Sequence, residues 1–168
     1  LVLSNQEIQN MGFPSEFILT SEGVNEDTQS PELIDFSISP LGGDMSDGFE
    51  DITFTMTLQD DLSGFGGSFG FELQYPLEGW LNDAWVWFEI NNNQIDVIVE
   101  QGFSIQNIDY SISEDGLNVI GSVTLRYNPY SFELGTYEIN AIETYDNSGN
   151  WLVLSNQEIQ NMGFPSEF

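Results

Sequence analysis

Residues 51–59 read DITFTMTLQ, a stretch in which apolar and polar side chains alternate without a break. One face collects the apolar side chains Ile52, Phe54, Met56 and Leu58, while three threonines occupy the other face. This period of two is typical of a half-buried β-strand, and the β-branched threonines favour it further. The stretch therefore predicts a strand with one face in a hydrophobic core.

Similar stretches recur along the chain, separated by clusters of Gly, Asn, Asp and Pro. They predict further strands at 33–40, 68–75, 84–90, 95–100, 117–127, 136–145 and 151–154. Chains of this length with many short antiparallel strands usually form two packed sheets. We therefore expect an all-β fold, specifically an antiparallel Ig-like β-sandwich.

One helical signal stands near the C-terminal end. Ser155 and Glu158 have the S-x-x-E spacing of a capping box, and Gly163 marks a stop. The same pair recurs as Ser4 and Glu7. We expect one short helix near the C-terminal end of the sandwich.

The first residues of the chain return at its end. LVLSNQEIQNMGFPSEF occurs at 1–17 and again, letter for letter, at 152–168. Such identity is typical of a tandem array, and an engineered duplication is the alternative. In the array interpretation 1–17 is the tail of a preceding repeat, with its last strand and short helix. Residues 18–30 are then an interdomain linker, and 31–168 form one sandwich repeat.

The apolar residues Leu1, Val2 and Leu3 then form a last strand without its own sheet. They could be disordered, pack on an edge of this domain, or fill the equivalent place in another molecule. In a longer array they would complete the preceding domain. The expected partners are neighbouring copies of the same repeat, in the same chain or as strand-exchanged subunits.

The charge of the chain is very one-sided. There are 28 acidic side chains and a single base, Arg126, which gives a formal net charge of −27. Nucleic acids and anionic membranes are bound through Lys and Arg, so neither is an expected partner. Self-repulsion of this size favours bound cations or high ionic strength. We therefore expect marine or other saline surroundings.

The residue types also argue against catalysis. Without His, Cys or Lys the common nucleophile and base arrangements are absent. A glycosidase would need two carboxyl groups flanking a cleft, whereas Asp60 and Asp61 are adjacent in a predicted turn. We expect no enzyme.

Four short stretches resemble a known kind of repeat. They are ELIDFSISP (32–40), ITFTMTLQDDLSGF (52–65), GTYEINAIETYDNSGN (135–150) and GFPSEF (163–168). They resemble the Ig-like or cadherin-like repeats of large secreted bacterial surface proteins such as adhesins, which carry a DDxSG turn and a D-N-x-G-N turn. The resemblance implies a sandwich repeat of an extracellular bacterial fibre, stalk or adhesin. Residues 76–116 depart from the pattern and leave the strand order there open.

Acidic segments should meet at one pole of such a sandwich. The loop after the second strand, the loop before the last strand and the incoming linker all reach that pole. Carboxylate, amide and carbonyl oxygens are the ligands that Ca²⁺ prefers. The expected ligands are Glu22, Glu26, Asp27, Asp60, Asp61, Asp146, Asn147 and Asn150. Ordinary turn chemistry, in which Asp and Asn bond the nearby backbone, is the alternative.

A second candidate site is aromatic. In residues 84–90, AWVWFEI, the side chains of Trp85 and Trp87 point away from the face shared by Val86 and Phe88. The two indoles could be covered by residues 91–116, contact a neighbouring domain, or stack on sugar rings.

The sequence thus favours a structural tandem-repeat domain whose joints are rigidified by Ca²⁺. The alternative is a carbohydrate-binding β-sandwich module that uses exposed tryptophans to bind glycans.

Overall fold

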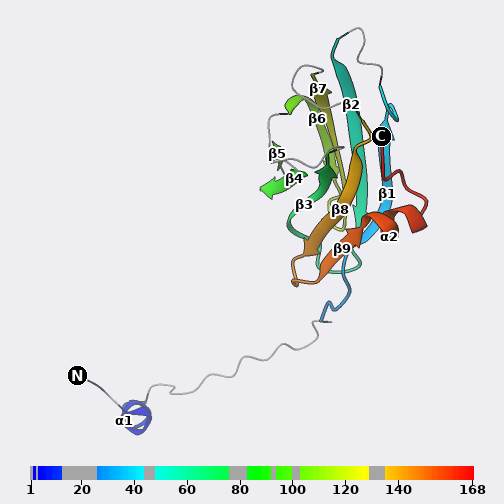
Figure 1. Ribbon diagram of the computed structural model, residues 1–168. Helices are drawn as coiled ribbons and strands as arrows, with labels where there is room; N and C mark the ends of the chain where they lie inside the picture. Colours follow the sequence, from blue (N-terminus) through cyan, green and yellow to red (C-terminus); the bar gives the residue numbers. More distant parts are fainter. Residues whose placement is uncertain are drawn as a thin grey trace.

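The computed structural model describes residues 2, 4–12, 26–43, 48–75, 83–91, 94–99, 103–128 and 135–168. In this part of the chain nine strands and two short helices follow one another (Figure 1). The strands are β1 (Glu32–Ser39), β2 (Glu50–Gln59), β3 (Phe65–Gln74), β4 (Asp83–Asn91), β5 (Gln94–Val99), β6 (Ser104–Ile112), β7 (Asn118–Tyr127), β8 (Glu138–Asp146) and β9 (Trp151–Ser155). The helices are α1 (Asn5–Asn10) and α2 (Asn156–Asn161).

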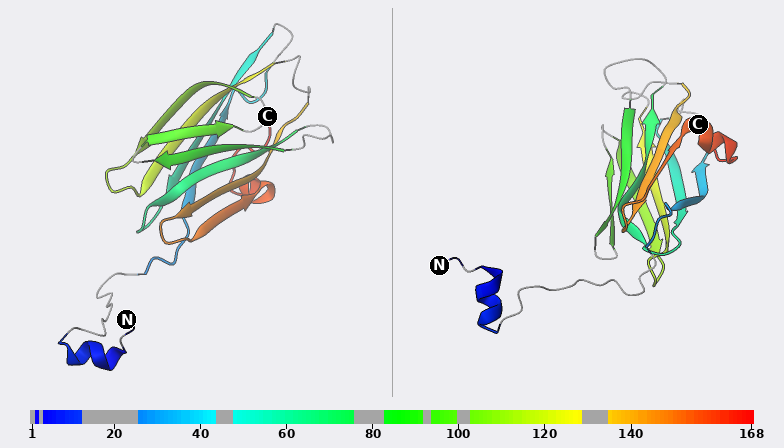
Figure 2. Two further views of the ribbon diagram at one scale, coloured as in Figure 1. Left: turned by 90° about the vertical axis from the view of Figure 1, so that its left-hand side faces the viewer. Right: turned by 90° about the horizontal axis from the view of Figure 1, so that it is seen from below.

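The strands form two sheets that pack face to face (Figure 2). One sheet has the order β1-β2-β7-β6 and the other β5-β4-β3-β8-β9, and neighbouring strands pair antiparallel throughout. This is the strand order of a nine-stranded, variable-type immunoglobulin topology. The prediction of an all-β, antiparallel, Ig-like sandwich with a short C-terminal helix is confirmed.

The core lies between the sheets, where the period of two places it. The alternating apolar side chains of β2 are all buried, and Phe54 is fully enclosed. From the facing sheet Phe71 of β3 packs against Phe54 with ring centroids 4.9 Å apart. Burying a side chain of this size stabilises a fold by about 1.5–3 kcal/mol. On the outer face Thr53 and Thr55 bond the β7 hydroxyls of Thr124 and Ser122.

A glycine lets the sheets approach closely at one point. Gly121 of β7 faces the stacked rings of Phe69 and Phe88, whose centroids are 4.7 Å apart. A Cβ atom at Gly121 would lie 2.8 Å from Phe69 and 2.9 Å from Phe88. The stacked pair therefore fills the space that a larger residue would need.

Strand β6 was not predicted. It is the edge strand of the four-stranded sheet, and most of its residues are exposed. Its register against β7 shifts between Ile105 and Asn107, so Gln106 is an extra residue in the ladder. A bulge of this kind breaks the alternation on which the sequence argument depends. The apolar positions Ile105 and Ile108 consequently stand three residues apart instead of two.

The two copies of the repeated segment form the same helix. In α2 the backbone N–H and hydroxyl of Ser155 donate to the Glu158 carboxylate, and in α1 those of Ser4 donate to Glu7. The capping box is therefore encoded locally, because it forms in both surroundings. α2 packs beside β8 and β9, whereas α1 lies outside the sandwich (Figure 1). Neither of these described helices has the length and apolar character needed to cross a membrane.

Candidate metal centre

Three segments converge at one pole of the sandwich. Asp27, in the segment before β1, accepts a 3.0 Å hydrogen bond from the backbone N–H of Ser63 in the β2–β3 loop. Asn150, from the β8–β9 turn, donates its side-chain amide to the Asp27 carbonyl at 3.2 Å. Asn147 of the same turn donates to the carbonyls of Ser63 and Gly64. The structure thus brings the two loops and the incoming chain together, as the sequence predicts.

Asp60 forms the floor of this pole. It is 2% exposed, and its Oδ2 accepts backbone hydrogen bonds from Leu62 at 3.2 Å and Gly64 at 2.6 Å. Gly64 has φ +75°, a left-handed conformation that lets the DDLSG loop turn tightly around the carboxylate. Among the described residues no partner bonds the buried Oδ1 of Asp60. A buried carboxylate oxygen without a partner is costly, and a bound cation is one way to satisfy it.

Two further carboxylates stand beside Asp60. Asp27, Asp60 and Asp61 each place one carboxylate oxygen within 4.8 Å of an oxygen of the other two. Among the described residues, these three carboxylates are the group close enough together to share a metal ion. Asp60 and Asp61 also border a surface pocket of about 240 Å³, which Gln29, Ser30, Glu32 and Gln59 complete. The cluster therefore opens to solvent on one side, where water molecules could complete a coordination shell.

The electrostatics of the cluster are those of crowded negative charge. Partial desolvation and the charges of Asp27, Asp60 and Asp146 raise the pKa of the Asp61 carboxyl above its ordinary value. Hydrogen bonding by Ser63 lowers the pKa of Asp27, although desolvation opposes it. The contacts of Asp27 thus favour its ionised carboxylate, whereas the surroundings of Asp61 disfavour its ionised form. A divalent cation would favour the charged form of Asp61.

The other expected ligands have different surroundings. Asp146 is buried, and both of its oxygens accept hydrogen bonds from Asn150, from the backbone at 2.8 Å and from the side chain at 2.7 Å. Asn147 and Asn150 use their amide N–H groups to brace the loops. Glu26 is exposed and does not belong to the cluster, and Glu22 lies outside the described residues. A ligand role for these five residues stays a prediction.

Taken together, the arrangement can hold a hard cation. Ca²⁺ takes six to eight oxygen ligands at about 2.3–2.6 Å, and carboxylates bind it through one or both oxygens. Asp27, Asp60 and Asp61 can supply three to six of these oxygens. Gly64 was expected to supply a tight turn at this site, whereas Ser63, whose backbone groups also shape it, was not singled out from the sequence. The DDxSG pattern around them was the available signal.

The tryptophans lie elsewhere, on the outer face of the five-stranded sheet. Trp85 and Trp87 are partly buried and stack on each other, with centroids 4.7 Å apart and planes at 8°. Trp87 pairs with Gly70 of β3, where its ring occupies the space of a side chain. In the described part of residues 91–116, β5 and β6 are strands of the two sheets. That residues 91–116 cover the indoles stays a prediction. Contact with a neighbouring domain and sugar stacking both remain open.

A second aromatic pair on this sheet was not singled out. Tyr145 of β8 and Trp151 of β9 stack with centroids 4.7 Å apart, and Trp151 and Val153 are exposed. The continuous apolar run WLVL at 151–154, which is apolar on both faces of a strand, was the available signal. Of the three N-terminal apolar residues, Val2 is 97% exposed, and Leu1 and Leu3 lie outside the described residues.

Comparisons with protein-family models, with curated proteins and with solved structures find no match for this chain. Its function is therefore inferred from the geometry and chemistry of the chain itself.

Proposed function

We propose that this chain is a structural repeat of an extracellular bacterial fibre, stalk or adhesin, and that Ca²⁺ stiffens the joint at which the preceding segment enters the sandwich. The observation that carries the proposal is the position of Asp27. This residue belongs to the incoming segment, yet its carboxylate lies with those of Asp60 and Asp61, which belong to the domain. A cation shared among them would cross-link the two sides of the joint.

The joint has a built-in dependence on metal. Without a cation, three carboxylates stand within 4.8 Å of one another and repel. The hydrogen bonds from Ser63 and Asn150 hold Asp27 near the other two despite this repulsion. Bound Ca²⁺ would turn the repulsion into attraction and restrict the angle between the segment and the sandwich.

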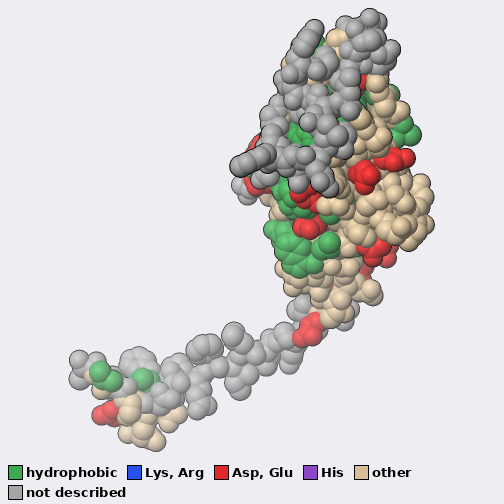
Figure 3. Space-filling view, in the orientation of Figure 1, with side chains coloured by type: hydrophobic (Ala, Val, Ile, Leu, Met, Phe, Trp, Pro, Cys, Tyr) green, Lys and Arg blue, Asp and Glu red, His purple; other side chains and the backbone are tan. Residues whose placement is uncertain are grey.

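The composition supports the proposed setting. A net charge of −27 opposes compaction at low ionic strength, and seawater-like salt or millimolar Ca²⁺ would relieve it. Acidic side chains are scattered over the face of the sandwich shown in Figure 3. A surface of this kind suits cations as partners, and suits neither nucleic acid nor anionic membranes. Neighbouring copies of the repeat, which carry the same charge, would repel one another across it unless bound cations or salt screen the charge. The proposal includes no catalytic role.

Joint stiffness can be measured with spin labels, because the chain has no Cys to interfere. Labels at Gln9→Cys in α1 and Ser111→Cys in β6 occupy exposed positions on the two sides of the joint. The distance distribution between them should narrow on addition of Ca²⁺ and widen again in chelator. Asp61→Asn should abolish the narrowing, and the matched control Asp96→Asn, at an exposed position of β5, should keep it. An equally broad distribution with and without Ca²⁺ would refute the stiffened joint.

A carbohydrate-binding role is the second candidate, because the indole pair is only partly buried. The geometry gives it limited support, since each ring of Trp85 and Trp87 already uses one face to stack on the other. Titration with glycans, followed by tryptophan fluorescence, tests it. A saturable change that Trp87→Ala removes and Trp151→Ala retains would favour this role over the spacer.

A further inference from the structure

The repeated segment is an integral part of the sandwich at its C-terminal copy. Residues 152–168 supply most of β9, the whole of α2 and a closing tail. β9 pairs with β8 at the edge of the five-stranded sheet, with Leu152 opposite Thr144 and Ser155 opposite Ala141. The segment therefore completes a sheet, and the strand it bonds would otherwise be an open edge.

The tail that follows α2 reaches into the core. The ring of Phe168 contacts Phe54 of β2, Tyr127 of β7 and Tyr137, with centroids 5.2, 5.8 and 5.5 Å apart. Phe168 and Tyr137 also exchange two backbone hydrogen bonds of 3.0 Å. The aromatic side chain thus packs on two strands of the four-stranded sheet and on Tyr137, which directly precedes β8 of the other sheet.

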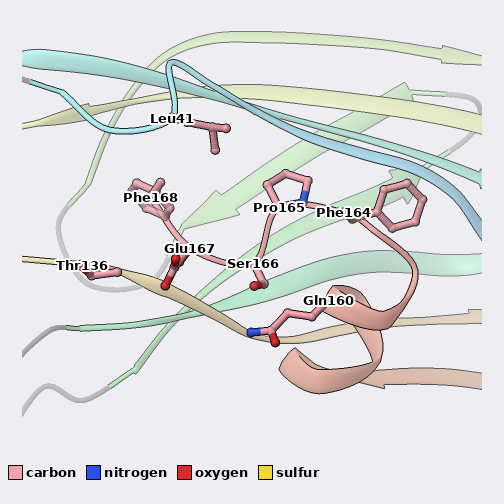
Figure 4. A pocket seen from close by; sticks show the side chains of 8 residues that line it. All are labelled: Leu41, Thr136, Gln160, Phe164, Pro165, Ser166, Glu167 and Phe168. Atoms are coloured by element: carbon pink, nitrogen blue, oxygen red, sulfur yellow. The ribbon is translucent and has the colours of Figure 1, made fainter.

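Further contacts anchor the helix between β9 and the tail. Ile159 of α2 is 0% exposed, and the Asn156 side chain donates to the carbonyls of Ile139 and Ser166. The tail also lines a surface furrow of about 630 Å³, together with Leu41 and Thr136 (Figure 4). We call the site filled by residues 152–168 the acceptor slot, defined by β8, Tyr137 and the core rings Phe54 and Tyr127.

The N-terminal copy carries the same chemistry without such contacts. Its helix α1 is already capped by Ser4 and Glu7, as α2 is by Ser155 and Glu158. Ile8, the counterpart of the fully buried Ile159, is partly exposed. Because the two copies are identical, every side chain that docks in the slot is present a second time, attached by residues 18–31 to β1.

We propose that the acceptor slot binds residues 1–17 of a second copy of this chain, so that copies join head to tail by exchange of this segment. The inference deepens the proposed function, since it rests on the repeat architecture and names the partner of the repeat, but it does not require Ca²⁺. Donor and slot lie on different parts of the molecule, so the contact is heterologous, and it propagates into an open chain unless the rotation between successive copies closes a ring. Fourteen connecting residues, 18–31, span at most about 46–50 Å, which limits the spacing of successive sandwiches.

Competition decides when exchange occurs. The C-terminal copy is tethered next to the slot and has a high effective concentration, so an isolated wild-type chain should be mainly monomeric. Substitutions that weaken the binding of the C-terminal copy alone should let the N-terminal copy of a neighbouring molecule bind in the slot. This asymmetry gives a test in the full chain, because each copy can be altered separately.

The test variant is Ile159→Asp with Phe168→Ala, measured by light scattering after size-exclusion chromatography over a hundredfold range of concentration, in chelator. We expect its mass to rise with concentration to at least twice that of the monomer. The matched control, Ile8→Asp with Phe17→Ala, should remain monomeric, and the variant with all four substitutions should lose the assembly. A test variant that stays monomeric at every concentration, including one closed by its own N-terminal segment, would overturn the proposal.

A second measurement covers a test variant that fails to fold alone. Excess synthetic peptide of residues 1–17 should restore its β-sheet circular dichroism and slow the hydrogen exchange of the Tyr137 and Ile139 amides at least tenfold. The same peptide with Ile8→Asp and Phe17→Ala should do neither. Absence of any effect of the unaltered peptide contradicts exchange. All of these measurements are made in chelator, so a negative result would reject segment exchange without bearing on the calcium-stiffened joint. A negative result in the calcium experiments would likewise leave segment exchange untouched.

Discussion

The backbone N–H of Ser63 donates a 3.0 Å hydrogen bond to Oδ2 of Asp27, although the two residues are 36 positions apart. This contact holds the segment before β1 against the β2–β3 loop. Asn150 adds a second contact by donating to the Asp27 carbonyl from the β8–β9 turn. Asp27 is therefore the residue through which the incoming chain is fastened to the pole.

Replacing Asp27 with Ala should release this fastening. The Ser63 N–H would lose its acceptor, and its amide hydrogen exchange should speed up at least tenfold, since an unbonded amide at the surface is unprotected. The neighbouring exposed residue gives a control, Thr28→Ala, which should leave the exchange of Ser63 unchanged. Unaltered protection in Asp27→Ala would show that the segment is held by other contacts.

The pH dependence of metal-free stability should depend on Asp61. Its pKa is raised in the folded protein, so the folded state binds this proton more tightly than the unfolded state does. Stability is therefore lost as the pH rises from the ordinary value of 3.8 through the raised folded value. In chelator at neutral pH, Asp61→Asn should unfold at a higher urea concentration than the wild type, with a flatter pH profile.

Asp27 should change the stability of the metal-free protein with pH in the opposite direction to Asp61. Its pKa is lowered on folding, so its contribution is present above the ordinary value of 3.8 and is lost as the pH falls through the lowered folded value. Urea midpoints measured across this range distinguish the two carboxylates. A wild type and an Asp61→Asn variant with superimposable profiles would contradict the crowding of charge at the pole.

The core should not tolerate a methyl group at Gly121. An added Cβ would meet the stacked rings of Phe69 and Phe88 from the opposite sheet, and overpacking of this kind costs about 1–3 kcal/mol. Denaturant unfolding of Gly121→Ala measures the loss. The adjacent Ile120 is exposed on the same strand, and Ile120→Ala should cost about 1 kcal/mol or less. Equal losses for the two variants would mean that the rings can move away.

The identical ends of the chain give an internally matched pair of substitutions. Asn156 bonds the carbonyls of Ile139 and Ser166, so Asn156→Ala should lower the free energy of unfolding by about 1–3 kcal/mol. Asn5 stands at the same position of the N-terminal copy, whose helix lies outside the sandwich, and Asn5→Ala should change little. If both variants lost the same stability, the two copies would be docked alike.

Most of the fold followed from one local property, the alternation of apolar side chains. It located β2, whose register against β7 is regular along the whole strand. It also located β1 and β3, although their ladders with β2 and β8 carry register shifts. It failed at β6, where the extra residue Gln106 shifts the register. A bulge depends on how a strand pairs with its neighbour, and the sequence of the strand alone does not specify that pairing.

The candidate metal site was predictable to a smaller extent. Asp27, Asp60 and Asp61 were expected at one pole because the topology brings their segments there. The sequence could not show that Asn147 and Asn150 present N–H groups to the loops, since an amide side chain can turn either end toward a neighbour. The buried Oδ1 of Asp60 likewise depends on the path of the loop around it.

The measurement that most directly tests the calcium-stiffened joint is the melting temperature in Ca²⁺ and in chelator, at matched ionic strength. Extracellular sites bind Ca²⁺ with Kd of about 10⁻⁴–10⁻³ M. A hundredfold excess over Kd then adds about 2.7 kcal/mol, or about 5–10 °C for a chain of this size.

We predict this rise for the wild type and for Asp96→Asn, and its loss in Asp61→Asn. A wild-type melting temperature that does not respond to Ca²⁺, or that rises as much with NaCl of the same ionic strength, would contradict a calcium-bound joint.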